Sequence, residues 1–281
     1  MTRYRQLHIY ILLTLFSFFA LNIYGQKANK NVKPKKGERS EFVADIQPDH
    51  IARKARPDRH PKELPMPNLF SKGGGRHVYG STGLHGIDVS HYQGRIDWDQ
   101  VARDPNAGYV YLKATEGANY TDDTYQRNFS ECKRVGLKVG SYLFFRPNTS
   151  ASVQFEQFRS VVNTRQQDLI PLIDAESMNG VSIATFQSRL LELCQLLEKE
   201  YGKAPLIYTG RNFYNKNIHG NAKLTSYKFF IAAYSMEEPQ LYGDEDYLMW
   251  QYTAQGRVQG IRGDVDMSHF VGSHTLKEIL Y

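Results

Sequence analysis

The sequence has few cysteines and no long apolar run beyond its N-terminus. Two Cys among 281 residues are too few for a disulfide framework or a cysteine-rich zinc module. Outside residues 9–24, no stretch approaches the ~18 apolar residues of a membrane-spanning helix, which excludes a polytopic membrane protein. The nine His show no HxxxH or HExxH spacing. We therefore predict no metal site.

Positive charge is concentrated in the N-terminal part of the chain. Residues 1–82 hold 15 Lys and Arg against 6 Asp and Glu, whereas residues 83–281 hold 20 basic and 23 acidic residues. The formal net charge of +6 therefore comes from residues 1–82, whereas residues 83–281, which have the composition of a folded domain, are slightly acidic. A slightly acidic domain argues against a duplex-binding surface, so we expect no nucleic-acid partner.

Residues 1–25 have the pattern of an export signal, because Arg3 and Arg5 precede the apolar residues 9–24. A cleaved signal peptide and a retained N-terminal membrane anchor both stay open. Residues 26–82 contain KPKKGER, RPDRHPKELPMP and SKGGGR, which predicts a disordered basic linker. We therefore expect an exported protein, in the periplasm, at the cell surface or secreted. The linker is either a solvated tether or a segment that associates with the envelope or a membrane surface.

Residues 83–281 alternate short apolar runs with segments of helical periodicity, and we predict that they form one catalytic domain. Apolar residues recur every three or four positions in 123–135, 150–162 and 182–201. Strands that alternate with helices predict a parallel sheet. The first strand is not followed by a GxGxxG turn, which disfavours a doubly wound dinucleotide fold.

Eight strands are predicted, and the last three follow one another with little room for helices. We therefore predict an α/β fold of the TIM-barrel type that lacks helices in its last third. The strand candidates are residues 84–90, 109–115, 138–145, 169–176, 204–209, 229–234, 247–253 and 265–270.

Carboxylates follow several of these strands, at the end where barrel enzymes carry their active sites. Asp174 and Glu176 are two positions apart in LIPLIDAE, so both side chains should point to one face of a strand. Two carboxylates this close cannot ionise independently, so one is kept protonated beside an ionised partner. Glycosidic cleavage needs this pair, and Glu176, with the longer side chain, is the predicted proton donor.

Two further acidic residues are predicted at the same rim of the barrel. Asp88 ends the first strand, in HGIDVSHYQ, and Asp266 lies on the last, in GDVDMSHF. We predict that both are catalytic. The alternatives are that Asp88 caps the following segment and that Asp266 makes a structural hydrogen bond.

Aromatic and polar residues near strand ends are predicted to bind a sugar chain. An aromatic ring near the mouth of a barrel can stack on the apolar face of a sugar. Glu116 is placed either to line the cleft or to orient Lys113. The predicted substrate-binding residues are Tyr142, Tyr208, Trp250, Gln251 and Glu116.

Six motifs resemble those of glycoside hydrolase family 25, the Chalaropsis-type lysozymes. They are IDVSHYQGRIDW, YLKATEG, GSYLFFRP, LIDAE, WQYT and VDMSHF, in this order from about residue 85 to residue 270. The resemblance implies a flattened (β/α)5β3 barrel. It also implies N-acetylmuramidase activity, which cleaves the β-1,4 bond between N-acetylmuramic acid and N-acetylglucosamine in peptidoglycan. We expect a monomer that needs no cofactor and acts on peptidoglycan glycan strands.

The resemblance also implies roles for the acidic residues. By position, the family's carboxylates fall on Asp88, Asp174, Glu176 and Asp266, with Glu176 as proton donor. Two routes are open: attack by the N-acetyl group of the substrate, oriented by Asp174, and direct attack by water.

Two other interpretations of residues 83–281 remain to be weighed. The first is a non-catalytic module that binds cell-wall glycan, although such a module has no chemical need for four carboxylates. The second is a chitinase-like hydrolase, which would require a DxxDxDxE strand motif that LIPLIDAES lacks. Cys132 and Cys194 fall on the apolar faces of different predicted helices. We predict buried free thiols, with a disulfide as the alternative.

Overall fold

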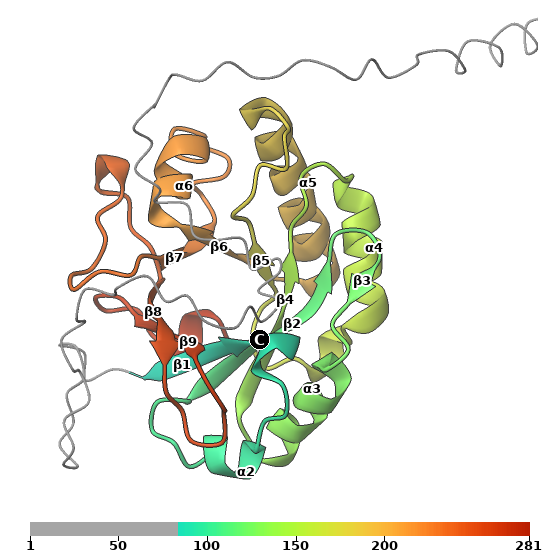
Figure 1. Cartoon of the computed structure of the whole chain (residues 1–281). Coiled ribbons are helices and arrows are strands. Elements are labelled where there is room, and N and C mark those ends of the chain that lie inside the picture. The colour runs from blue at the N-terminus through green and yellow to red at the C-terminus, as the bar shows by residue number, and fades with distance from the viewer. Residues whose placement is uncertain (1–83) are drawn as a thin grey trace, which may run out of the picture. The chain divides into compact units, whose positions relative to one another are not determined.

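A closed barrel of strands forms the centre of the computed structural model, which describes residues 84–281 (Figure 1). The predicted leader 1–25 and linker 26–82 lie outside the described residues. Strand β1 (His85–Val89) pairs with β2 (Tyr109–Glu116) on one side and with β9 (Val265–Phe270) on the other, which closes the ring. The ring continues through β4 (Lys138–Phe144), β5 (Leu172–Asp174), β6 (Leu206–Gly210), β7 (Lys228–Ala232) and β8 (Met249–Gly256).

The direction of the strands brings their carboxyl ends to one rim. From β1 to β8, each strand runs parallel to its neighbours along the ring, whereas β9 runs antiparallel to both β8 and β1. The short strand β3 (Tyr120–Thr121) pairs only with β2, outside the ring. All eight predicted strands are confirmed, and so is an α/β barrel.

Helices cover part of the barrel and follow its earlier strands (Figure 1). The predicted helices 123–135, 150–162 and 182–201 are confirmed as α3, α4 and α5. Helix α6 was not predicted, because its sequence RNFYNKN lacks an apolar period. Within residues 84–281, no α-helix follows β7, β8 or β9. The α-helices are α2 (Trp98–Val101), α3 (Tyr125–Arg134), α4 (Ala151–Val161), α5 (Ile183–Tyr201) and α6 (Arg211–Asn217).

Helix α5 shows how the sequence sets the bounds of an element. Its N-cap Ser182 accepts a hydrogen bond from the backbone N–H of Thr185, which satisfies a donor that the first turn leaves unpaired. At the other end Gly202 adopts φ +70°, a left-handed conformation that glycine takes without steric cost. Between them, Leu190, Leu193 and Leu197 are fully buried against the sheet, and each contributes about 1.5–3 kcal/mol of hydrophobic stabilisation.

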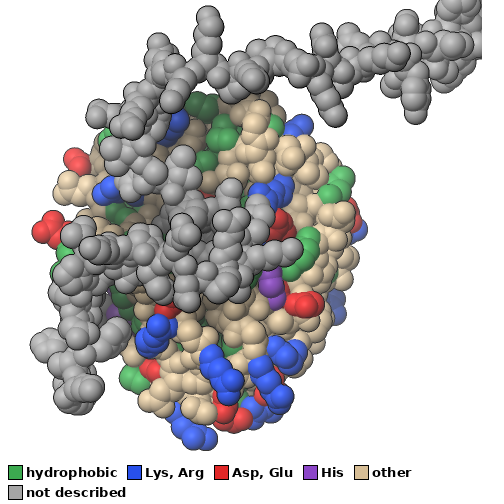
Figure 2. Space-filling view, viewed as in Figure 1, with side chains coloured by type: hydrophobic (Ala, Val, Ile, Leu, Met, Phe, Trp, Pro, Cys, Tyr) green, Lys and Arg blue, Asp and Glu red, His purple; other side chains and the backbone are tan. Residues whose placement is uncertain are grey.

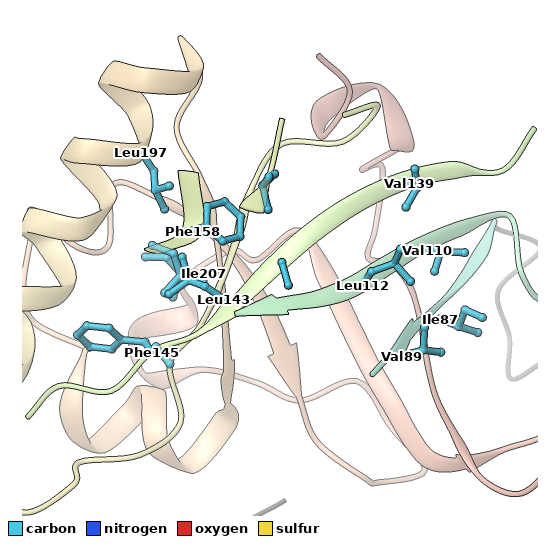
Figure 3. Close-up of a cluster of buried hydrophobic side chains, with 14 of the residues drawn as sticks. Ile87, Val89, Val110, Leu112, Val139, Leu143, Phe145, Phe158, Leu197 and Ile207 are labelled. Atoms are coloured by element: carbon cyan, nitrogen blue, oxygen red, sulfur yellow. The ribbon is translucent and has the colours of Figure 1, made fainter. Parts of the chain in front are cut away.

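Alternation along the strands divides the core into two layers. The outer layer lies between the strands and the helices. It is one cluster, in which Ile207 lies near Phe158 and Leu197, while Val110 and Val139 lie at its other end (Figure 3). The inner layer fills the barrel with side chains of opposite parity, and its members are Tyr109, Tyr111, Leu169, Ile170, Leu172, Leu206, Tyr208, Phe230, Ala232, Leu248, Met249 and Ile279.

Two glycines make room for the tyrosines inside the barrel. A Cβ on Gly86 would lie 2.1 Å from Cε2 of Tyr109, and one on Gly140 would lie 2.6 Å from Cε1 of Tyr111. The Tyr109 hydroxyl lies 2.9 Å from Oγ of Ser268. Bulky rings thus fill the barrel below its carboxyl-terminal rim, which leaves the polar residues at that rim.

Both cysteines are buried free thiols, as predicted: Cys132 lies on α3 and Cys194 on α5. Burial raises the pKa of both thiols, so both are poor nucleophiles at neutral pH. On the surface, basic and acidic side chains lie intermixed where α2 and α3 are found (Figure 2). There Arg134 bonds Asp99 and Glu131 at 2.8 Å each. No helix within residues 84–281 is both long and apolar enough to cross a membrane.

Candidate active site

Asp88 and Asp266 face each other on the inner wall of the barrel. They are direct partners in the antiparallel pairing of β1 with β9, and their side chains share a hydrogen bond. Burial raises the pKa of Asp88 to about 6, against the opposing effect of hydrogen bonds from Gln251 and Asp266. Burial and then the charge of Asp88 raise the pKa of Asp266 well above its usual value. The pair therefore holds a proton under mildly acidic conditions.

Asp174 ends strand β5 and is almost completely buried, with 8% of its surface exposed. Burial raises the pKa of its carboxyl well above the usual range, and the charge of Glu176 raises it further, whereas the charge of Lys113 lowers it. Its Oδ1 atom is buried without a hydrogen-bond partner among the described residues. A buried oxygen of this kind can receive a hydrogen bond from a bound ligand.

Glu176 lies just beyond β5 rather than on it. The strand ends at Asp174, shorter than the predicted run 169–176. The backbone N–H of Ala175 donates to the Tyr208 carbonyl on β6 at 2.9 Å, which holds this segment against the barrel. The charge of Glu176 acts on Asp174, Asp266 and Tyr208. The four predicted carboxylates are therefore brought together at one rim.

Gln251 connects Asp88 to two tyrosines. Its Nε2 donates to Oδ2 of Asp88 at 3.0 Å. Its Oε1 accepts from the hydroxyls of Tyr208 at 2.9 Å and Tyr234 at 2.8 Å. Because Gln251 is 1% exposed, these bonds fix its amide and orient the Asp88 carboxylate.

The predicted aromatic residues fall on different faces of the barrel. Tyr208 belongs to the inner layer, and the partly buried Tyr142 packs against it. After burial, the charges that raise the Tyr142 pKa come from Asp174, Asp88 and Asp266. Both tyrosines thus lie beside the carboxylates, and their contact with substrate stays a prediction.

Trp250 does not lie at the mouth, and its predicted placement is wrong. It packs in the outer layer, is 3% exposed, and donates from Nε1 to the Ala233 carbonyl at 2.7 Å. Its ring meets His269 edge-on, with centroids 5.3 Å apart. Neighbouring residues of a strand face opposite sides. Since Gln251 points to Asp88, Trp250 must point away from it.

Glu116 is held by two cations that were not among the predicted site residues. Its Oε2 lies 2.6 Å from Nζ of Lys113, and its Oε1 accepts from Nε of Arg146 at 3.0 Å. Partial burial raises the pKa of Glu116, but the bonds from Lys113 and Arg146 outweigh it and hold that pKa below its usual value. Of the two options for Glu116, the orientation of Lys113 is the one that this contact supports.

The chemistry available at this rim is proton transfer and charge stabilisation by carboxylates. Within residues 84–281, no group of three or more His, Cys, Asp or Glu side chains is arranged to hold a metal ion. Tyr234 also belongs to the site through Gln251, although it was not a predicted binding residue. Its position at the end of the run FFIAAY was the available signal.

A closed α/β barrel with carboxylates of raised pKa at the ends of its strands is typical of glycoside hydrolases. Residues 87–261 match the model of glycosyl hydrolases family 25, and the chain belongs to this family. It is therefore a glycoside hydrolase.

Similar proteins include lysozymes. The chain is 31% identical over 205 residues to lysozyme M1 of Streptomyces globisporus, which covers 69% of each chain. It is 36% identical over 194 residues to the uncharacterized protein YegX of Escherichia coli (strain K12), covering 68% of this chain and 70% of that one. A solved structure, the bacterial lysozyme from Streptomyces coelicolor, matches with a TM-score of 0.63 and 29% identity, covering 71% of this chain and 96% of that one.

Proposed function

We propose that the protein is an exported N-acetylmuramidase that hydrolyses the β-1,4 bond between N-acetylmuramic acid and N-acetylglucosamine in peptidoglycan. The observation that carries the proposal is the convergence of Asp88, Asp174, Glu176 and Asp266 at one rim of the barrel. Membership of a family that includes lysozymes supports the choice of substrate.

In the proposed reaction, Glu176 donates a proton to the leaving glycosidic oxygen. Burial and then the charge of Glu176 raise the pKa of Asp174, so the two carboxyls do not ionise independently, and we propose that they share one proton. Protonated Glu176 beside ionised Asp174 is the productive form. The ionised carboxylate stabilises the positive charge that develops at the anomeric carbon as the glycosidic bond breaks.

The nucleophile is either the carbonyl oxygen of the substrate's own acetamido group or a water molecule. In the first route, Asp174 accepts a hydrogen bond from the acetamido N–H and orients the group. Two displacements then retain the anomeric configuration, whereas a single attack by water inverts it. An NMR spectrum recorded early in hydrolysis of a soluble glycan fragment would distinguish the two by the anomer that forms first.

Asp88 and Asp266 are proposed to complete the cleft opposite this pair. Gln251 holds Asp88 in one orientation, and the bond between Asp88 and Asp266 lets the two carboxyls share a proton. The shared proton limits negative charge in the cleft.

The variant Glu176→Gln tests the proposed function. It should abolish the release of soluble fragments from purified peptidoglycan while the protein still pellets with the polymer. Glu192→Gln, an exposed change on α5, is the matched control and should keep full activity. Unchanged turnover in Glu176→Gln would eliminate the assigned acid. Binding without fragment release by the wild type would instead favour the non-catalytic module.

The remaining predictions concern architecture and location. The order of the described strands and helices supports a (β/α)5β3 layout, and we propose that the protein acts as a monomer. We propose export from the signal pattern of residues 1–25 and envelope association from the basic character of residues 26–82, with a solvated tether as the alternative for the linker. Deleting residues 26–82 should reduce sedimentation with envelope preparations and leave the rate on soluble fragments unchanged. A tenfold lower rate on fragments would contradict the tether.

A further inference from the structure

An irregularity in strand β2 places two charged side chains on the same face. Residues 113 and 116 would ordinarily point to opposite faces, because side chains alternate along a strand. The register with β4 shifts between Lys113 and Thr115, so Ala114 is an extra residue that pairs with no residue of β4. Such a bulge re-aims the side chains that follow it. Lys113 and Glu116 consequently meet at 2.6 Å.

Arg146 extends this pair into a chain of three charges. Its guanidinium donates to Glu116 from Nε at 3.0 Å and from Nη2. Its backbone is fixed by Gln154, whose Oε1 accepts from the Arg146 N–H and whose Nε2 donates to the Arg146 carbonyl, both at 2.9 Å. Because Gln154 is fully buried, the position of Arg146 is set by the core.

The ring of Phe144 holds both cations in place. The Arg146 guanidinium lies 4.4 Å from the ring centroid, and Nζ of Lys113 lies 5.1 Å from it. The side chains of Lys113 and Arg146 are 7% and 14% exposed. Charges this well shielded from water act over longer distances than surface charges do.

The chain of charges lies next to Asp174. Glu116 pairs with Phe144, and Phe144 pairs with Asp174, so the three residues occupy one level on neighbouring strands β2, β4 and β5. The groups that face Asp174 are Glu176 on its own segment, Asp88 from β1, Lys113 and Glu116 from β2, Tyr142 from β4 and Tyr208 from β6.

These neighbours act on the Asp174 carboxyl in opposite directions. The charges of Glu176, Asp88 and Glu116 favour its protonated form, and the charge of Lys113 favours its ionised form. Glu116 touches Lys113, so it would cancel much of that favourable field if it were not itself paired.

We propose that Lys113, Glu116 and Arg146 form an ion chain that favours the ionised form of Asp174 against the opposing effects of burial and of its acidic neighbours. In this chain Arg146 is a positioning residue: it neutralises Glu116 and leaves the charge of Lys113 to act on Asp174. Arg146 then supports catalysis through Glu116 and Lys113, without touching the reacting atoms. This inference rests on the proposed function only in that the ionised Asp174 carboxylate serves glycoside hydrolysis.

The test uses two single variants that should move the same quantity in opposite directions. Arg146→Gln leaves Glu116 unneutralised and should raise the apparent pKa of the acidic limb of kcat/KM on soluble peptidoglycan fragments by about 0.5 to 1 unit. Glu116→Gln frees both cations and should lower it by a similar amount. The double variant should lie between them, and Arg146→Lys should return the limb toward the wild-type value.

A purely structural role would give a different pattern. Loss of packing would lower kcat/KM in both variants without shifting the apparent pKa of the acidic limb in opposite directions. Arg159→Gln, which removes an exposed guanidinium from α4, is the matched control and should not shift the limb. Limbs that do not shift, or that shift in the same direction in Arg146→Gln and Glu116→Gln, would overturn the proposal.

A second measurement does not require activity. The full chain labelled with ¹³C at the Asp side-chain carboxyl can be titrated by NMR, and the Asp174 signal identified by its loss in Asp174→Asn. The Asp174 titration should move up in Arg146→Gln and down in Glu116→Gln. If the protein cleaves no glycan yet these shifts occur, the proposed function fails and the ion chain stands. If the protein cleaves glycan but the opposed shifts do not occur, the ion chain fails and the proposed function stands.

Discussion

Asp88 and Asp266 share a hydrogen bond across the two antiparallel strands that close the barrel. One carboxyl of such a pair must carry a proton to donate this bond, and the other accepts it. The strand direction matters here, because β9 runs against β1 and brings residue 266 level with residue 88. The strand pairing that closes the barrel therefore also brings together two of the four carboxylates of the site, Asp88 and Asp266.

Replacing Asp88 by Asn should stabilise the protein at neutral pH. Burial raises the pKa of Asp88 from 3.8 to about 6, so the folded state binds this proton more tightly than the unfolded chain does. The stabilising contribution of protonated Asp88 is complete below pH ~4 and is lost as the pH rises through about 6. At pH 7 we expect Asp88→Asn to raise the free energy of unfolding by about 1–3 kcal/mol, measured by urea denaturation. Asp123→Asn, an exposed site, is the control, and equal effects would contradict this explanation.

Gln251→Ala should impair activity without unfolding the protein. The change removes the donor to Asp88 and the acceptor of Tyr208 and Tyr234. Since a hydrogen bond to a charged group contributes about 1.5–3 kcal/mol, we expect kcat/KM to fall about 10- to 100-fold. Gln255→Ala, at an exposed position of the same strand, should keep wild-type kinetics. A Gln251→Ala enzyme with normal kcat/KM would show that the orientation of Asp88 is unimportant.

His85 should make the protein less stable in acid. Burial, followed by the charge of His269, lowers the His85 pKa from 6.5 to about 4. The unfolded chain therefore binds the proton first, and stability is lost as pH falls from about 6.5 toward 4. His85→Gln should flatten the decline of the unfolding free energy over this range, as followed by thermal or urea denaturation. An unchanged slope would assign the acid sensitivity to other groups.

Trp250→Phe should affect stability rather than substrate binding. The indole N–H bonds the Ala233 carbonyl and the ring packs in the outer layer. Loss of this bond and of buried surface should lower the free energy of unfolding by about 1–3 kcal/mol. We expect KM on glycan fragments to stay within twofold of the wild-type value. A severalfold rise in KM would contradict this and would indicate that Trp250 contributes to substrate binding.

Much of this fold was predictable from the sequence because its elements follow simple periods. Helix α5 repeats apolar residues along one face, and each predicted strand is a short apolar run between turns. Asp88 and Asp174 were predictable because parallel strands bring their carboxyl ends to one rim. Asp266 reaches the same rim from the beginning of β9, because that strand runs antiparallel to β1. The period is absent from α6, whose seven residues bury only Tyr214 and Asn217.

The errors and omissions at the site arise where the sequence does not show which face of a strand a side chain takes. The sequence does not show the bulge at Ala114, so the contact between Lys113 and Glu116 could not be derived from parity. Trp250 and Gln251 are adjacent, and alternation allows only one of them to face the inside of the barrel. Nothing in the order of residues identified which one, and the bond from Gln251 to Asp88 decides it.

The identity of the reducing end released from peptidoglycan tests the central claim most directly. Purified peptidoglycan is digested with the full chain, the soluble fragments are reduced with borohydride, and their masses are determined. Cleavage after N-acetylmuramic acid predicts fragments that end in reduced muramic acid, formed by the wild type and by Glu192→Gln but not by Glu176→Gln. Fragments that end in reduced N-acetylglucosamine, or no fragments at all, would contradict the proposed activity.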